Sequence, residues 1–162
     1  MKPEAVLLIA GEGGHLTQMK RLLKRMQSST LSESTTFLGL WEKGRPIESL
    51  DGYHLLPVRN KHSIAVTISQ IPRAAWYYLV ALFQLQRRYR IRGVISTGPG
   101  IAVIPSIVFR LLGARVVFIE TWSRFDTHSW TGRLMYRVAQ RFYVQNREQL
   151  DFYPKAQFRG RL

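Results

Sequence analysis

The sequence predicts an α/β fold, a Rossmann-like parallel sheet with helices on both faces. Short apolar runs alternate along the chain with helical stretches, which is typical of parallel strands joined by right-handed crossovers. The first run, residues 5–10, is apolar throughout, as in a strand that is buried on both faces. The chain has 162 residues, of which 46% are hydrophobic. This is enough for one ordinary core, so we expect a single domain over residues 1–162.

The pattern of the first part of the chain predicts a strand, a glycine-rich loop, a helix and a second strand, in this order. Residues 5–10 form an apolar run that Gly11 ends, and they are predicted as the first strand. Between residues 16 and 26, apolar side chains recur at three- and four-residue spacing with lysines and arginines between them. This spacing predicts an amphipathic helix. Residues 35–41 are rich in threonine and aromatic residues, which predicts a second strand.

The later part of the chain repeats this alternation. Strands are predicted at residues 93–97, 114–119 and 141–145. Helices are predicted at residues 101–112 and 132–140, the first of them closed by Gly113.

A longer helical stretch at residues 64–89 contains an apolar run of ten residues. A spanning helix requires roughly 20 apolar residues, so we expect this stretch not to cross a bilayer. At about 100° per residue, one face of the helix is expected to pack on the sheet. That face consists of Ile68, Ile71, Ala75, Tyr78, Leu79 and Leu82.

The opposite face of this helix is also apolar, with arginines at its ends. We expect it to lie in the headgroup layer of a membrane, where basic residues contribute about 1 kcal/mol each near an anionic surface. The residues expected to contact the membrane are Arg73, Trp76, Tyr77, Val80, Phe83, Arg87, Arg88 and Arg90. The alternative is a crossover helix buried on both sides, by the sheet and by a neighbouring helix or subunit.

Charge and composition narrow the function class. The formal net charge is +14, and residues 52–119 contain no carboxylate at all. This balance predicts an anionic partner, which is nucleic acid, anionic lipid or a phosphorylated substrate. The chain has no cysteine, which excludes disulfide scaffolds, thiolate metal sites and a cysteine nucleophile. We also predict no metal site and no cofactor, because neither an Asp-x-Asp pair nor metal-ligand histidine spacing occurs.

The segment Gly11-Glu-Gly-Gly-His15 lies between the predicted first strand and the following helix. Free backbone N–H groups and the helix dipole favour an anion there, so we predict a phosphate site. It is not a dinucleotide fingerprint, because Leu16 stands where the third glycine would be. The alternative is that the glycines only permit a tight turn. His15 is either a general base or a polar residue at a helix start.

A second loop of this kind, Ser96-Thr-Gly-Pro-Gly100, follows a later strand. Because the carboxyl ends of parallel strands share one edge, we expect the loops at His15, Thr97 and Glu120 to converge on one crevice. Glu120 either positions a sugar hydroxyl or orients a base. Alternatively, it caps a helix or forms an ion pair with Arg124.

Four ordered motifs make the chain similar to a known family. They are Gly11-Glu-Gly-Gly-His-Leu-Thr-Gln-Met19, Ser96-Thr-Gly-Pro-Gly100, Phe118-Ile-Glu-Thr-Trp-Ser-Arg124, and a tail that contains Thr131-Gly-Arg-Leu-Met-Tyr136, Phe142-Tyr-Val-Gln145 and Tyr153-Pro-Lys-Ala156 with Gly160 and Leu162. Together they resemble the asparagine-linked glycosylation protein fourteen family over essentially the whole chain.

The resemblance implies half of an enzyme. The chain would be equivalent to the N-terminal, acceptor-binding half of an inverting, metal-independent GT-B glycosyltransferase. A separate, protein-thirteen-like chain would bind the UDP-sugar, and the subunit would be inactive without it. The acceptor would be a polyprenyl-diphosphate-linked saccharide. Eukaryotic members commonly carry an N-terminal membrane segment, and we expect none in this chain. We therefore expect a bacterial capsule or exopolysaccharide type, peripheral on the cytoplasmic face of the inner membrane.

With this resemblance, the candidate residues acquire roles. The catalytic candidates are His15 and Glu120. The residues expected to bind the acceptor diphosphate or sugar are Gly11, Glu12, Gly13, Gly14, Thr97, Gly98, Gly100 and Arg124. The residues expected to dock the partner chain are Tyr153, Phe158 and Leu162, unless they close the core of this domain.

Two other function classes stay open at this point. One is a non-enzymatic nucleic-acid-binding module, which the charge favours. Against it, the sequence has no helix-turn-helix, ribonucleoprotein aromatic motif or zinc-finger spacing. The other is a self-sufficient sugar transferase, which the length disfavours because a GT-B enzyme needs two such lobes.

Overall fold

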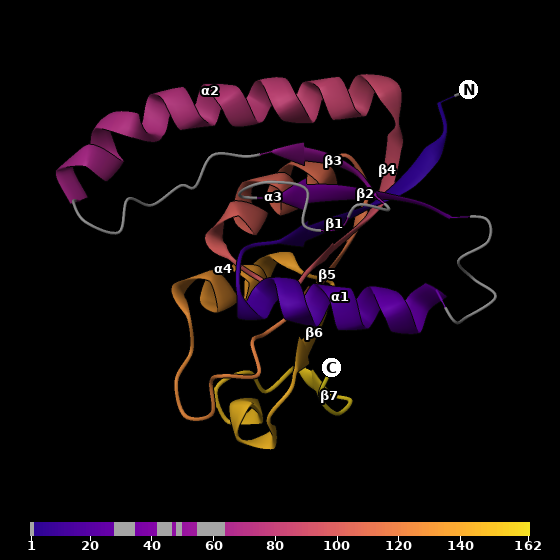
Figure 1. Cartoon of the computed structure of the whole chain (residues 1–162). Coiled ribbons are helices and arrows are strands. Elements are labelled where there is room, and N and C mark those ends of the chain that lie inside the picture. The colour runs from indigo at the N-terminus through magenta and orange to yellow at the C-terminus, as the bar shows by residue number, and fades with distance from the viewer. Residues whose placement is uncertain (1, 28–34, 42–46, 48–49, 55–63) are drawn as a thin grey trace.

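A parallel sheet organises the fold (Figure 1). The computed structural model describes residues 2–27, 35–41, 47, 50–54 and 64–162, without the side chains of residues 52–54 and 64–75. Within this part of the chain the sheet has seven strands in the order β3-β2-β1-β4-β5-β6-β7, and every neighbouring pair is parallel. The strands are β1 (Glu4–Ala10), β2 (Thr36–Trp41), β3 (Asp51–His54), β4 (Arg90–Ser96), β5 (Arg115–Ile119), β6 (Arg141–Val144) and β7 (Gln157–Phe158). The predicted Rossmann-like fold is confirmed.

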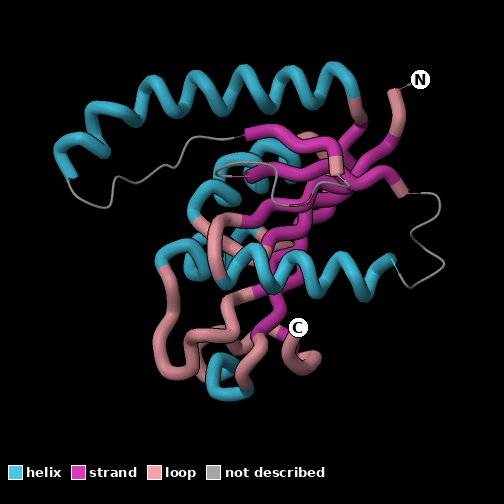
Figure 2. The backbone as a smooth tube through the Cα atoms, viewed as in Figure 1, coloured by secondary structure: helices cyan, strands magenta, loops and turns pink. Residues whose placement is uncertain are grey.

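Helices cover both faces of this sheet, as Figure 2 shows. They are α1 (Gly14–Gln27), α2 (Ile64–Arg88), α3 (Val103–Leu111) and α4 (Trp130–Val138), with short 3₁₀ turns η2 (Gly100–Ala102) and η3 (Arg147–Leu150). The predicted helix at residues 101–112 therefore begins as a 3₁₀ turn.

Strand β1 shows why the two faces differ. Leu7 and Ile9 point into a core with residues of α2, α3 and α4. Leu8 and Ala10 alternate with them and pack with Met19 of α1 on the other side. This period-two alternation between two apolar layers explains why the strand is apolar at every position from residue 5 to residue 10.

Two strands were not predicted from the sequence, β3 and β7. Both lie at an edge of the sheet, and they span only four and two residues. An edge strand needs neither a continuous apolar run nor much length, so its sequence carries little signal.

Helix α2 packs on the sheet with a narrower stripe than predicted. Tyr78 and Leu82 are buried as expected, and Leu85 continues the stripe. The inward prediction for Leu79 is wrong, because its side chain is 53% exposed. Leu79 follows the buried Tyr78 by one position, and a 100° rotation carries it off the stripe. The predicted inward residues Ile68, Ile71 and Ala75 lie outside the described side chains.

None of the helices in the described part of the chain is long and apolar enough to span a membrane.

Candidate functional site

The strand order reverses at β1, which lies between β2 and β4. β1 pairs with β2 on one side and with β4 on the other, so consecutive crossovers leave in opposite directions. In open α/β sheets, ligands bind at this switch point, outside the carboxyl ends of the strands. The two predicted glycine loops follow β1 and β4. The expected convergence of these loops is therefore present.

His15 and Thr97 join the two loops. The His15 Nδ1 atom lies 2.6 Å from the Thr97 carbonyl oxygen, and the Thr97 hydroxyl donates to the His15 carbonyl at 2.8 Å. A carbonyl oxygen only accepts hydrogen bonds, so Nδ1 carries the proton. In the neutral ring, Nε2 is then the unprotonated nitrogen, which is the form that a general base requires.

The first loop leaves the start of α1 open. Gly13 has a positive φ of 63°, which favours glycine. A Cβ atom placed on Gly13 or Gly14 would meet no atom within 4 Å. Both residues are exposed, as is Glu12, whereas Gly11 is buried. An accessible helix start with free space above its glycines suits an anion.

The second loop is fixed by its own serine. The Ser96 hydroxyl accepts from the Gly98 N–H at 3.1 Å and lies 3.3 Å from the Gly98 carbonyl. Gly98 has a φ of +88°. Gly100 is exposed, and a Cβ there would lie 3.7 Å from Thr131 Oγ1. These bonds fix the loop internally, and the two Thr97 bonds join it to His15.

Glu120, by contrast, is buried in a hydrogen-bond network and only 2% exposed. Its carboxylate accepts from the Tyr153 hydroxyl at 3.1 Å, from the Ser129 hydroxyl at 3.2 Å and from the Thr121 N–H at 3.0 Å. Ser129 caps α4 by accepting from Gly132 N–H at 2.7 Å. Glu120 is therefore not itself the cap of α4, but it holds the hydroxyl of Ser129, the residue that is.

The same network changes the acidity of Tyr153. Burial raises the pKa of the Tyr153 hydroxyl above its ordinary value, and the nearby negative charge of Glu120 raises this pKa further. Gly132 completes the packing, because a Cβ at this position would overlap the Glu120 carboxylate. Tyr153 is 2% exposed and belongs to the core. The structure therefore favours the alternative for Tyr153, in which it closes the core of this domain.

The other predicted binding and docking residues lie at the same edge of the sheet or close to it. Arg124 is half-buried, and its guanidinium donates to Thr127 Oγ1 at 3.1 Å rather than to Glu120. Phe158 is half-buried beneath Arg147, whose guanidinium carbon lies 5.1 Å from the ring centroid. Leu162 is half-buried, and its carbonyl accepts from Arg21 at 2.9 Å.

Sequence reasoning missed a chain of buried amides under this edge. Gln145 Nε2 donates to Gln18 Oε1 at 2.5 Å and to the Glu120 carbonyl at 2.9 Å. Gln18 Nε2 donates to Thr121 Oγ1 at 3.3 Å, and Leu162 N–H donates to Gln145 Oε1 at 2.9 Å. One signal was available, since Gln18 stands beside Met19 on the buried side of an amphipathic helix. The network ties α1 to the ends of β5 and β6.

The outer face of α2 is exposed where its side chains are described. Trp76 and Phe83 are 71% and 64% exposed, and Tyr77, Leu79 and Val80 are also exposed. Arg87 and Arg88 are exposed at the end of the helix, with the Arg87 guanidinium carbon 5.8 Å from the Phe83 ring centroid. Arg90 lies at the start of β4, 4.0 Å from Glu4. The side chain of Arg73 lies outside the described residues. No described element of this chain covers the face.

Comparison with known proteins decides the family. Residues 6–162 match the family described as "Oligosaccharide biosynthesis protein Alg14 like". The chain belongs to this family. Its relatives include the "UDP-N-acetylglucosamine transferase subunit ALG14" of Kluyveromyces lactis, 25% identical over 99% of this chain and 79% of the relative. The human protein of the same name is 22% identical over 98% of this chain and 82% of the relative.

Solved structures with a similar fold include the MurG of Acinetobacter baumannii. Its TM-score is 0.61 at 18% identity, over 88% of this chain, and the chain spans only 41% of that MurG chain. The TubZ of Clostridium botulinum phage c-st has a TM-score of 0.52 at 14% identity, over 92% of this chain and 53% of that chain. Such likenesses show the fold alone. Membership of the Alg14-like family therefore decides between the function classes that the sequence left open, in favour of a glycosyltransferase subunit.

Proposed function

We propose that this chain is the membrane-associated, acceptor-binding subunit of a two-component glycosyltransferase. A partner subunit binds the UDP-sugar, and the sugar is transferred to a polyprenyl-diphosphate-linked saccharide on the cytoplasmic face of a membrane. In a bacterium this reaction extends the repeat unit of a capsular polysaccharide or exopolysaccharide. The observation that carries the proposal is the reciprocal pairing of His15 and Thr97 at the switch point.

His15 is the general base in this proposal. Its Nδ1 proton is engaged by the Thr97 carbonyl, so Nε2 receives the proton of the attacking sugar hydroxyl. The hydroxyl oxygen forms a bond to the anomeric carbon of the donor sugar as the bond from that carbon to the UDP oxygen breaks. UDP leaves with the electron pair. A single displacement of this kind inverts the anomeric configuration, and no step requires a metal ion.

The glycine loops bind the diphosphate of the acceptor. Gly13 and Gly14 have open space above them, and the positive end of the α1 dipole lies there. On the other loop, the exposed Gly100 contacts the diphosphate, and the buried Thr97 and Gly98 support it from behind. Glu12 and Arg124 contact the acceptor sugar next to the diphosphate. Glu120 is a positioning residue, because its carboxylate is already occupied by three donors within the fold.

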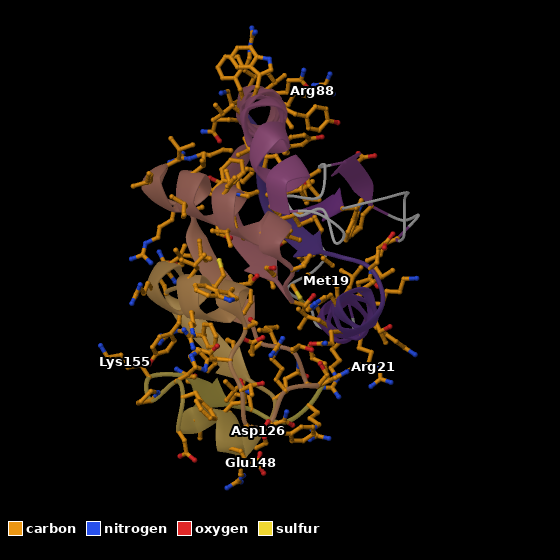
Figure 3. All side chains as sticks on the ribbon, turned by 90° about the vertical axis from the view of Figure 1, so that its left-hand side faces the viewer. Met19, Arg21, Arg88, Asp126, Glu148 and Lys155 are labelled. Carbon is orange, nitrogen blue, oxygen red and sulfur yellow. The ribbon has the colours of Figure 1, made fainter. Side chains whose placement is uncertain are left out.

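Helix α2 brings the subunit to the membrane. Its outer face is aromatic and aliphatic, and Arg87 and Arg88 follow at its end. Figure 1 shows the amino-terminal part of α2 extending beyond the carboxyl edge of the sheet, so this helix reaches past the crevice. Figure 3 shows Arg88 at one end of the molecule and the acidic residues Asp126 and Glu148 at the other. This polarity orients the side of the molecule that carries α2 toward an anionic surface.

The decisive experiment replaces His15 in the full chain, purified together with its partner subunit. Asparagine at this position keeps an amide N–H in the place of Nδ1–H and removes Nε2. His15→Asn should lower kcat by about 10²- to 10⁴-fold, the usual contribution of a general base. The fold and the KM for the acceptor should change little. The assay is transfer of radiolabelled sugar from a UDP-sugar to a short-chain polyprenyl diphosphate saccharide.

The control separates catalysis from loop structure. Thr97→Val removes the hydroxyl bond to the His15 carbonyl but keeps the Thr97 carbonyl that orients the ring. We expect this variant to retain kcat within about tenfold. A His15→Asn enzyme with wild-type kcat would show that the base lies elsewhere. Full activity of the purified chain without any partner would contradict the two-component part of the proposal.

A further inference from the structure

A cavity of about 300 Å³ opens beside α4, and none of its lining residues belongs to either glycine loop. Its apolar lining comes from exposed side chains. Trp130 is 80% exposed, Leu134 46% and Phe152 40%. Large apolar side chains that gather around a hollow at the surface mark a binding site more often than isolated ones do. The cavity is therefore a candidate site of its own.

The polar lining of the cavity is basic. It includes His128, Arg133 and Arg137, and no carboxylate is among its described lining residues. The Arg133 guanidinium carbon lies 5.6 Å from the centroid of the Trp130 ring. Residues 127–147 contain no aspartate or glutamate. The surface is thus complementary to carboxylates.

Two tyrosines of the cavity lining are already engaged within the fold. The Tyr153 hydroxyl donates to Glu120 at 3.1 Å, and the Tyr136 hydroxyl accepts from the Lys155 N–H at 2.7 Å. Their ring centroids lie 5.1 Å apart. A wall that is fixed before binding lowers the entropy lost on association, which is a property of energetically important interface pockets.

We propose that this cavity docks the nucleotide-sugar-binding partner subunit, through an apolar side chain of the partner that is flanked by carboxylates. The inference rests on the proposed function, which requires such a subunit. Tryptophan and arginine around a pocket are the residue types that dominate protein interfaces. A concave site fits a protruding side chain, whereas a bilayer surface offers none. A second copy of this chain would bring like charges together, which is unfavourable.

The test is site-specific photocrosslinking of the full chain in the cells that produce it. A photoreactive benzoylphenylalanine replaces Leu134 in the cavity, Phe125 in the loop after β5, or Lys24 on α1. Figure 3 shows that the flank with Lys155 is opposite the flank of α1 with Arg21. We expect position 134 to yield an adduct with a nucleotide-sugar-binding protein, joined at a segment that contains Asp or Glu beside an apolar residue. Position 24 should yield none.

The other outcomes separate this inference from the proposed function. An adduct with that protein at position 125 and none at position 134 would overturn the docking site and leave the proposed function standing. Adducts at position 134 with lipid or with a second copy would also overturn the docking site. If no position gave an adduct with a nucleotide-sugar-binding protein, both proposals would fail.

A charge variant tests the nature of the contact. Arg133→Glu with Arg137→Glu should lower the yield of the adduct at position 134 by at least about tenfold, since hot-spot contacts carry effects of this size. Arg133→Lys with Arg137→Lys should restore most of the yield. The matched control, Lys20→Glu with Lys24→Glu on α1, makes the same change in net charge and should leave the yield unaltered. Circular dichroism verifies that each variant is folded. An unchanged yield in the Arg133→Glu, Arg137→Glu variant would contradict the carboxylate contact.

Discussion

Gly98 approaches the imidazole of His15 so closely that no side chain fits between them. A Cβ atom on Gly98 would lie 2.7 Å from both Nδ1 and Cε1 of that ring. The loop after β4 therefore supports the histidine in two ways, through the Thr97 carbonyl that accepts from Nδ1 and through the backbone of Gly98 behind the ring. This contact makes the glycine a requirement of the site as well as of the turn.

Gly98→Ala tests that contact, and Gly113→Ala is its matched control. Both glycines have positive φ, of 88° and 90°, so both substitutions impose backbone strain of about 1–2 kcal/mol. A Cβ on Gly113 meets nothing within 4 Å. We expect both variants to lose similar free energy of unfolding in urea titrations. Only Gly98→Ala should lose kcat, by at least about tenfold, because only this variant displaces His15. Equal loss of kcat in both variants would contradict the contact.

Glu120 should matter for stability more than for proton transfer. Glu120→Ala leaves the Ser129 and Tyr153 hydroxyls buried without their acceptor, and we expect a loss of about 3 kcal/mol in the free energy of unfolding. Glu120→Gln keeps an acceptor oxygen and should lose about 1 kcal/mol. Its kcat should stay within about tenfold of wild type, with the acidic limb of the pH–rate profile intact. If the Glu120→Gln variant lost the acidic limb of the pH–rate profile, Glu120 would be the general base.

Tyr153 should make the fold sensitive to alkaline pH. Its hydroxyl has a raised pKa in the folded chain, first because it is buried and then because Glu120 is close. Below the ordinary tyrosine pKa near 10, the hydroxyl is protonated in both the folded and the unfolded chain. Above that pH, the unfolded chain releases the proton and the folded chain keeps it. Ionisation then lowers the free energy of the unfolded state, so stability falls as the pH rises.

The measurement is the urea midpoint of the wild type and of Tyr153→Phe between pH 8 and 11. Phenylalanine has no proton to release, so the variant should start less stable and then lose less stability above pH 10. Parallel curves for the two proteins would contradict the raised pKa.

The outer face of α2 should determine binding to anionic vesicles. Arg87→Glu with Arg88→Glu removes two basic residues, worth about 1 kcal/mol each, and should weaken binding by roughly 30-fold or more. Lys20→Glu with Lys24→Glu makes the same charge change on α1, across the sheet, and should weaken binding far less. Sedimentation with vesicles of phosphatidylglycerol and phosphatidylcholine measures both. Equal weakening would mean that net charge alone attracts the protein.

The elements that the sequence predicted well are those whose apolar pattern is local and continuous. The strand at β1, the helix at α1 and the long helix at α2 follow from the spacing of their own residues. The convergence of His15 and Thr97 was also predictable, because parallel strands bring their carboxyl ends to one edge. The edge strands β3 and β7 were not, since short edge strands are specified by the strand they pair with.

The sequence by itself determined the order of the strands and helices other than β3 and β7, the positions of the two glycine loops, and the surplus of positive charge. Only the tertiary structure decided which acid or base stays accessible. Glu120 and His15 both follow parallel strands, yet Glu120 is surrounded by Tyr153 and Ser129 from distant parts of the chain, whereas His15 is held through Nδ1 by the Thr97 carbonyl. The hydroxyls that bind the Glu120 carboxylate come from residues 9 and 33 positions away along the sequence. The carbonyl that binds the His15 ring comes from a residue 82 positions away. A local sequence pattern cannot predict such contacts, because they form only when the crossover helices and the C-terminal segment pack against the sheet.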